Sequence, residues 1–160
     1  MKKELLCILK KYETHPDFLG NTIEDINQVG GMDDTVLHIA ARNNSLNDAL
    51  VFLQNGGLID LKGDLGYTPL HYACMFGNIE MVKLLLDNRS DKNIQNEFGE
   101  NAVRITINSS NENKEKIVKL LNNFKTIDYK SILVDRSLYE TYNLYVECMQ
   151  YARTLKYFFP

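Results

Sequence analysis

The sequence of 160 residues has no tryptophan, only three prolines and three cysteines, and no surplus of positive charge. Lysine and arginine number 18 against 21 aspartate and glutamate, so the net charge is −3. General nucleic-acid binders carry a strong basic surplus, and we therefore expect no nucleic-acid partner. No apolar run approaches the ~18 residues that a membrane span needs, so we also expect no membrane segment.

The cysteines are too few and too widely spaced for a disulfide framework. Cys7, Cys74 and Cys148 are odd in number and lie far apart, and we interpret them as buried thiols in a reducing compartment. This interpretation predicts a cytoplasmic protein. Hydrophobic residues make up 44% of the chain, which is enough for one core without a disulfide or a metal.

An internal repeat organises the chain, and such a repeat is the first signal to follow in assigning a fold. In the best copy, Thr68 is a good helix N-cap, and Pro69 follows at the first helical position, where a missing N–H costs nothing. Gly77 then ends this helix, and apolar residues at helical spacing predict a second one. One constant offset relates Thr35 to Thr68, His38 to His71, Leu53 to Leu86, and Gly66 to Gly99.

The chain resembles the ankyrin-repeat family in the run Gly66-Tyr67-Thr68-Pro69-Leu70-His71-Tyr72-Ala73 and in Gly77-Asn78-Ile79 behind it. The offset also agrees with the period of that family, ~33 residues. The resemblance covers about residues 22–124. It implies an all-α ankyrin-repeat solenoid of about three helix-turn-helix repeats with β-turn fingers. We expect an N-terminal cap at 1–29, repeats at 30–62 and 63–95, a degenerate repeat at 96–124, and a C-terminal helical extension or cap at 125–160. The degenerate repeat carries about three extra residues in its loop, 108–113.

Both flanks are interpreted as caps, because terminal repeats must cover the exposed end of a repeat core. At the C-terminal end, Ser137 and Glu140 form a capping box that predicts a long helix to about residue 157. At the N-terminal end, residues 3–12 form a short amphipathic helix. The apolar residues expected to face inward on it are Leu5, Leu6, Ile8 and Leu9.

We find no constellation of residues that supports catalysis or metal binding. His38 and His71 belong to repeats whose helices pack ~8–10 Å apart, which is too far for two imidazoles on one metal ion. The resemblance implies instead that this histidine position links adjacent repeats by hydrogen bonds. Cys74 could contact His71 as a nucleophile contacts its base, but it fills a small-residue position and is better interpreted as a buried thiol. We therefore expect a non-enzymatic protein with no catalytic residue, no metal and no cofactor.

The resemblance leaves a surface as the place of function, because ankyrin ligands usually meet the finger tips and the concave face of the first helices. Met32, Leu65 and Phe98 recur at one finger position and predict an apolar ridge inside a charged rim, which is typical of a protein interface. A structural alternative stays open, in which the fingers pack on one another and their acids aid solubility. The partner-binding positions implied by the resemblance are Met32, Asp33, Asp34, Arg42, Asn43, Asp64, Leu65, Tyr67, Met75, Phe76, Glu97, Phe98, Glu100 and Asn108.

The fingers also concentrate negative charge. The segments 33–34, 60–67 and 97–100 hold six acids and one lysine, a charge of −5, so the rest of the chain carries about +2. Because complementary charges steer association, an acidic face predicts a basic protein partner.

These observations predict a protein–protein interaction module that is monomeric when free. The chain is similar to small bacterial ankyrin proteins, some of which look like immunity proteins, so the partner would be a basic toxin or enzyme that the module inhibits. The alternative is a secreted effector or viral modulator that binds a host protein through the same surface. An enzyme in the tail is disfavoured, because residues 128–160 are too few for an independent active site.

Overall fold

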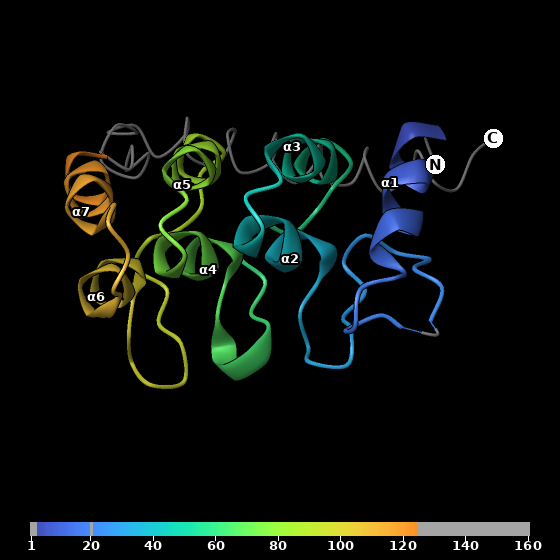
Figure 1. Ribbon diagram of the computed structural model, residues 1–160, viewed down its shortest axis with the longest axis horizontal. Helices are drawn as coiled ribbons and strands as arrows, with labels where there is room; N and C mark the ends of the chain where they lie inside the picture. Colours follow the sequence, from blue (N-terminus) through green and yellow to red (C-terminus); the bar gives the residue numbers. More distant parts are fainter. Residues whose placement is uncertain (1–2, 20, 125–160) are drawn as a thin grey trace, which may run out of the picture. The chain divides into compact units, whose positions relative to one another are not determined.

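The computed structural model describes residues 3–19 and 21–124, which form a row of helical hairpins joined by long loops (Figure 1). The described residues contain α-helices, one short 3₁₀ turn at Asp64–Gly66 and no β-strand, which confirms the expected all-α repeat fold. The expected C-terminal extension, including the capping box at Ser137, lies outside the described residues. The helices are α1 Lys3–Tyr12, α2 Val36–Arg42, α3 Leu46–Gln54, α4 Pro69–Met75, α5 Ile79–Asp87, α6 Ala102–Asn108 and α7 Lys114–Asn123.

The helices form two rows. The first helices of the repeats, α2, α4 and α6, pack against one another, and the second helices, α3, α5 and α7, form the other row (Figure 1). Helix α1 has the bounds that its sequence pattern predicts and packs on α3, so it occupies the place of a second helix ahead of repeat 1. The loops that lead into α2, α4 and α6 project from the first row as three fingers (Figure 1).

Each finger is closed by one backbone hydrogen bond at equivalent positions. Glycine recurs in the second and third fingers at positions 66 and 99, where φ is +73° and +74°. A side chain is strained in this left-handed conformation, which explains the glycine. The three closing bonds run from the amide of Gly30 to the carbonyl of Asp34 (2.8 Å), from Gly63 to Tyr67 (2.7 Å) and from Asn96 to Glu100 (3.0 Å).

The turn between the two helices of a repeat also needs a left-handed residue. Gly77 supplies it in repeat 2 with φ +75°, and Asn44 supplies it in repeat 1 with φ +53°, because asparagine tolerates this conformation better than most residues. Repeat 3 departs from the pattern, since its helices are joined by residues 109–113, two more than the three residues 76–78 of repeat 2. Helix α7 is also one residue longer than α5. The sequence predicts about three extra residues in this loop, whereas the structure places two of them in the loop and one in α7.

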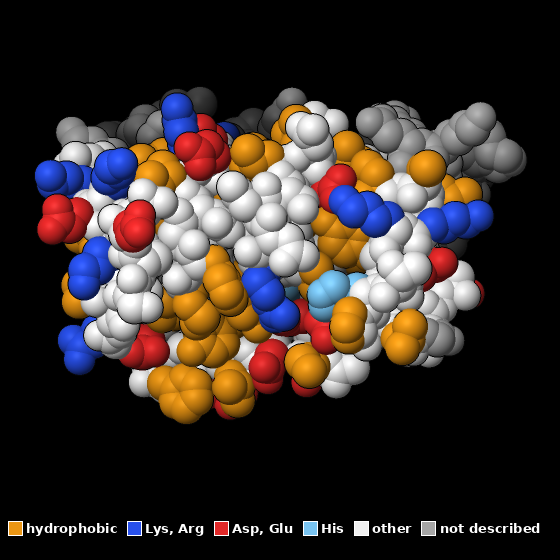
Figure 2. Space-filling model, viewed as in Figure 1, with side chains coloured by type: hydrophobic (Ala, Val, Ile, Leu, Met, Phe, Trp, Pro, Cys, Tyr) orange, Lys and Arg blue, Asp and Glu red, His pale blue; other side chains and the backbone are white. Residues whose placement is uncertain are grey.

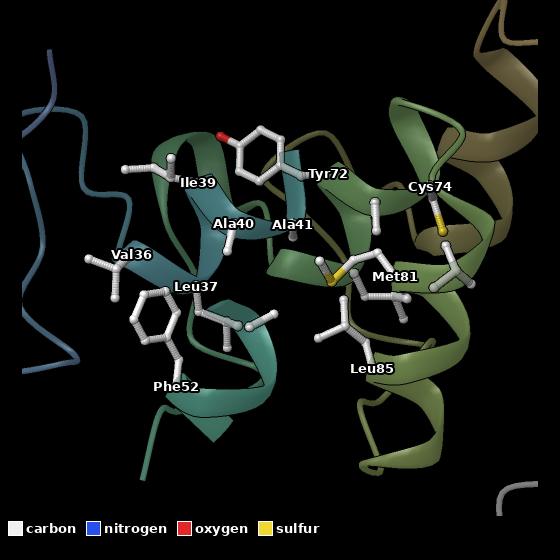
Figure 3. Packing of buried hydrophobic residues seen from close by; sticks show 14 of the residues in the cluster. Val36, Leu37, Ile39, Ala40, Ala41, Phe52, Tyr72, Cys74, Met81 and Leu85 are labelled. Atoms are coloured by element: carbon white, nitrogen blue, oxygen red, sulfur yellow. The ribbon is translucent and has the colours of Figure 1, made fainter. Parts of the chain in front are cut away.

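The core lies between the two rows of helices. Ala40 and Ala73 are fully buried, and their small side chains let the second helices approach the first. Large side chains from both rows fill the space between them (Figure 3). They include Leu37, Phe52, Leu70, Met81, Leu85, Ile117 and Leu121.

Two expectations for the N-terminal helix are wrong. Leu6 and Cys7 are exposed, although we expected Leu6 to face inward and Cys7 to be a buried thiol. The buried stripe of α1 is Leu5, Leu9 and Tyr12, spaced four and three residues apart, and this stripe turns Cys7 away from the core.

Cys74 matches the expectation of a buried thiol. Its side chain has no exposed surface, and burial raises the pKa of the thiol to about 12. A thiol held neutral at physiological pH is a poor nucleophile, since the thiolate is the reactive form. Cys148 lies outside the described residues.

Candidate functional site

The tips of the three fingers carry the expected apolar ridge. Met32 is 56% exposed, Leu65 45% and Phe98 62%. Figure 2 shows hydrophobic side chains at the finger tips and above them, over the first helices. Phe76, at the end of α4, is 50% exposed, whereas Met75 is half-buried. The ridge and the end of α4 thus expose more large apolar groups than a solvated loop needs.

An acidic side chain stands beside each apolar tip. Two of these acids are exposed and the third, Asp64, is half-buried. None of the three carboxylates accepts a hydrogen bond or forms an ion pair with another described residue. Their charges are therefore free to meet a partner. The three tip pairs are Met32 with Asp33, Leu65 with Asp64, and Phe98 with Glu97.

The expectation that Asp34 is an exposed finger acid is wrong, because its side chain is fully buried. Its carboxylate forms an ion pair with Arg42 and accepts a hydrogen bond from the backbone amide of Asp64 at 3.3 Å. Burial raises the pKa of Asp34, while a hydrogen bond from Tyr72 and the charge of Arg42 act against this rise. A carboxylate without exposed surface cannot contact a partner, so Asp34 holds the site together instead of lining it.

Arg42 and Tyr67 are half-buried and engaged within the protein. The guanidinium carbon of Arg42 lies 4.6 Å from the ring centroid of Tyr72, a cation–π contact. The ring of Tyr67 stacks on the ring of Tyr72, and the two ring centroids lie 5.5 Å apart. Burial raises the pKa of Tyr72. The sequence alone did not single out Tyr72, because a tyrosine on a first helix gives no sign of which neighbours it will meet.

Glu100 and Asn108, which are the repeat-3 equivalents of Asp34 and Arg42, lie at the surface. Glu100 is half-buried and its Oε1 atom accepts a hydrogen bond of 2.7 Å from Nδ2 of Asn108, which is exposed. Asn43, the residue after α2, is also exposed. All three side chains therefore keep solvent-exposed surface.

Both repeat histidines hydrogen-bond to the segment that leads into the next finger, and His38 also makes the link between repeats that the family resemblance implies. The backbone amide of Thr35 donates to Nδ1 of His38 at 3.0 Å, so this nitrogen is an acceptor and the ring proton is on Nε2. Nε2 then donates to the carbonyl of Leu61 at 2.9 Å, at the end of its own repeat, and also lies 3.2 Å from the carbonyl of Tyr67 in repeat 2. The same arrangement recurs one repeat later, where Nε2 of His71 lies 3.0 Å from the carbonyl of Ile94. Burial lowers the pKa of both imidazoles to about 4, although the carbonyl acceptors act against this fall.

A second link between repeats is one that sequence reasoning missed. Nδ2 of Asn78 donates to the carbonyls of Ala41 and Arg42 at the end of α2. Nδ2 of Asn111 contacts the carbonyls of Cys74 and Met75 in the same way. Helix ends leave their last carbonyls without partners, and each asparagine satisfies two of them in the preceding repeat. The signal was present, because the two asparagines stand one repeat period apart.

The family comparison matches this architecture. A family model described as ankyrin repeats, in three copies, matches residues 4–96. The chain belongs to the ankyrin-repeat family. The matched region begins in α1 and ends in the third finger, so it includes the two regular repeats and leaves out α6 and α7.

Similar ankyrin proteins come from animals, bacteria and viruses. The human palmitoyltransferase ZDHHC13 is 40% identical over 68 residues, which are 42% of this chain and 11% of that protein. An ankyrin repeat protein of Rickettsia bellii is 33% identical over 91 residues, 50% of this chain and 27% of that protein. An ankyrin repeat protein of fowlpox virus is 28% identical over 138 residues, 82% of this chain and 40% of that protein. The chain thus spans less than half the length of each of these relatives.

Ankyrin repeats are protein–protein interaction modules, and the fold is typically non-enzymatic. The match to the palmitoyltransferase is confined to its ankyrin region. In the part of the chain that the structure describes, no helix has the length and hydropathy of a membrane span.

Proposed function

We propose that this ankyrin module binds a folded protein partner that presents a basic, partly apolar patch. The observation that carries the proposal is the set of three finger tips, each with an exposed apolar side chain and a carboxylate that no described residue neutralises. In a protein interface, apolar side chains at the centre favour affinity, and charged side chains around the edge favour the correct orientation of the partner. The exposed Phe76 and the half-buried Met75 extend this surface onto α4.

Charge reversal at the tips tests this proposal. The variant Asp33→Lys, Asp64→Lys, Glu97→Lys removes the complementary field, and we expect it to weaken binding of the native partner by tenfold or more, mainly through a slower association rate. The control variant Glu80→Lys, Asp87→Lys, Glu115→Lys reverses three exposed acids on the second helices. Surface plasmon resonance at two salt concentrations measures both. Equal affinity of the tip variant and the wild type would show that the tips are not the binding surface.

As the biological role, we propose that the module is an immunity protein, an inhibitor that neutralises a cognate basic toxin. An acidic surface supports this role, since nuclease toxins are basic and their capture gains speed from electrostatic steering. Co-expression with toxin genes adjacent to its own gene provides the test. Rescue of growth by the wild type, and loss of rescue in the tip variant, is the expected result. Failure to rescue from every adjacent toxin would count against the immunity role.

The second candidate role is an effector or viral modulator that binds a host protein. The fowlpox relative, which matches 82% of this chain, supports it. This role uses the same surface, so genomic neighbourhood separates the two candidates. A gene next to a toxin favours immunity, whereas a gene among secretion or host-range genes favours the modulator.

We further propose that the free module is monomeric and works in the cytoplasm. The free thiols of Cys7 and Cys74 support a reducing compartment. Size-exclusion chromatography with light scattering tests the oligomeric state, and we expect the 18.4 kDa of a single chain. A mass of twice that value would show a dimer.

A further inference from the structure

The finger tips form a ladder that has one step in each repeat (Figure 1). Equivalent helices of packed neighbours stand roughly 8–10 Å apart, which sets the step from one repeat to the next. The second and third tips are also joined directly, because the backbone amide of Glu97 donates to the carbonyl of Leu65 at 3.1 Å. Figure 1 shows the three fingers side by side along the row of repeats. Each step of the ladder presents one apolar side chain and one carboxylate.

A ligand that uses every step must repeat its own side chains at about the same interval. An α-helix rises 1.5 Å per residue, so positions seven residues apart lie on one face about 10.5 Å from each other. A β-strand places side chains on one face at intervals of about 7 or 14 Å, neither of which fits. The spacing therefore favours a helix over a strand.

The width of the surface favours a helix over a polyproline segment, whose three-residue repeat of about 9 Å also fits the step. The apolar surface is not confined to the tips, because Phe76 at the end of α4 is half exposed and Tyr67 and Met75 are each half-buried. A helix with its side chains is roughly 10–12 Å across and can contact the tips and the end of α4 together.

The backbone of Leu65 supports a role for its side chain. Its φ is +49°, in the left-handed region where glycine or asparagine is less strained. The leucine is 45% exposed, so burial in the core does not compensate for this strain. A strained residue whose side chain faces solvent points to a contact made with another molecule.

We infer that the element bound at the finger tips is a basic amphipathic α-helix in which an apolar and a basic side chain recur every seven residues. This inference rests on the proposed function and specifies its partner. The apolar residues of the helix would meet Met32, Leu65 and Phe98, and its basic residues would pair with Asp33, Asp64 and Glu97.

Synthetic peptides test the spacing directly against the full chain. The first peptide is a 21-residue helix with three leucine–lysine pairs seven residues apart. The second has the same composition with the pairs five residues apart, which scatters them around the helix. The third is a proline-rich peptide with pairs three residues apart. Fluorescence anisotropy should show the first peptide binding at least tenfold more tightly than the others. Equal binding of the first two, better binding of the third, or no binding of the first at 1 mM would overturn the inference.

Two leucine variants locate the bound peptide. Leu65→Asn removes the apolar side chain but suits the left-handed backbone, so we expect it to fold and to bind the first peptide about tenfold more weakly. Leu50→Asn removes a similarly exposed leucine from α3 and should leave the affinity unchanged. An equal loss in both variants would place the peptide elsewhere and overturn the inference.

The native partner separates failure of this inference from failure of the proposed function. If the partner binds the tips, as shown by its sensitivity to Leu65→Asn, but cross-links to them through a loop or a strand, the helix inference is wrong and the function stands. If no tip variant changes the affinity for the native partner, both the helix inference and the proposed function are wrong.

Discussion

The junction between repeats 1 and 2 and the junction between repeats 2 and 3 share one hydrogen-bond scheme and differ in the side chains around it. At both, a buried histidine donates to a backbone carbonyl at the end of its own repeat, just before the next finger. The first junction also has a buried ion pair between Asp34 and Arg42, and the guanidinium of Arg42 lies over the ring of Tyr72. At the second, the positions equivalent to Asp34 and Arg42 hold the uncharged Tyr67 and Met75, and the repeat-3 equivalents, Glu100 and Asn108, meet at the surface. The comparison teaches that the repeat fixes the backbone contacts, while single side chains decide how much charge each junction buries.

The pH dependence of stability tests what the two junctions share. Both histidines have a pKa of about 4 when folded, against an ordinary value of 6.5. The unfolded chain therefore binds more protons between pH 6.5 and 4, so this part of the stability is complete above pH 6.5 and is lost as pH falls towards 4. Each histidine accounts for about 3 kcal/mol of that loss. Urea unfolding across this range, with His38→Gln and His71→Gln, measures it.

The histidine variants should be less stable at neutral pH, and each should flatten the pH profile by a similar amount. The buried carboxyl of Asp34 has the opposite sign, because its folded pKa is raised, so its contribution falls as pH rises above 3.8. A His38→Gln profile as steep as that of the wild type would contradict this account.

Substitution of a glycine at the first junction should have the next largest effect on stability. A side-chain carbon on Gly63 would collide with the Asp34 carboxylate and press on His38, so we expect Gly63→Ala to lower the free energy of unfolding by about 3 kcal/mol. Gly31→Ala is the control, because its nearest contact would be an ordinary 3.6 Å to the carbonyl of Asp17. Thermal unfolding compares the two. If both variants cost the same, the close approach at the first junction is not what the glycine serves.

A smaller difference in stability is expected between the pairs Asp34–Arg42 and Glu100–Asn108. Asp34→Asn breaks a buried ion pair and should cost about 2 kcal/mol, less than a fully buried pair because Arg42 is partly solvated. Glu100→Gln alters a pair at the surface and should change stability by less than about 0.5 kcal/mol. A double-mutant cycle with Arg42→Gln should show coupling for Asp34 and none for Glu100. Absence of coupling at Asp34 would mean that the first junction gains nothing from its ion pair.

The smallest effect concerns the small residue that each first helix buries, Ala41 in repeat 1 and Cys74 in repeat 2. Cys74→Ala makes the second junction like the first and leaves a small cavity, so we expect a loss of about 1 kcal/mol. A thiol reagent should modify the exposed Cys7 in the folded protein at a rate at which Cys74 stays unmodified. Rapid modification of Cys74 would show that α6 opens away from α4.

The sequence predicted the helices well, because Thr68, Pro69 and Gly77 act on the backbone within a few residues of themselves. It failed for Asp34, whose burial depends on Arg42 at the far end of α2 and on Gly63 and Tyr72 in the next repeat. The same residue type at position 33 is exposed. Finger acids therefore cannot be sorted into structural and surface groups from local pattern alone.

The apolar ridge, in contrast to Asp34, is a part of the site that the sequence predicts correctly. Met32, Leu65 and Phe98 were predicted from the repeat period, and their exposure agrees with that prediction. Their partner stays a prediction, because an exposed side chain carries no record of what it meets. The asparagine links at 78 and 111 could have been found by the same period, but their two-carbonyl geometry needs the three-dimensional structure.

The arrangement of helices in two rows, with contacts made between neighbours, also has a consequence for how the chain folds. Among the described residues, the helix pairs in close contact belong to the same repeat or to adjacent ones, so we expect residues 3–124 to fold quickly from contacts between neighbours. The middle repeat, α4 and α5, has a neighbour on each side and should be the last to open. In hydrogen exchange, the amides of this hairpin should then report the global unfolding free energy, while α1 exchanges through partial opening. A stress that melts the first or the last repeat would thus leave the central finger, and the ligand contact that we propose for it, folded longest.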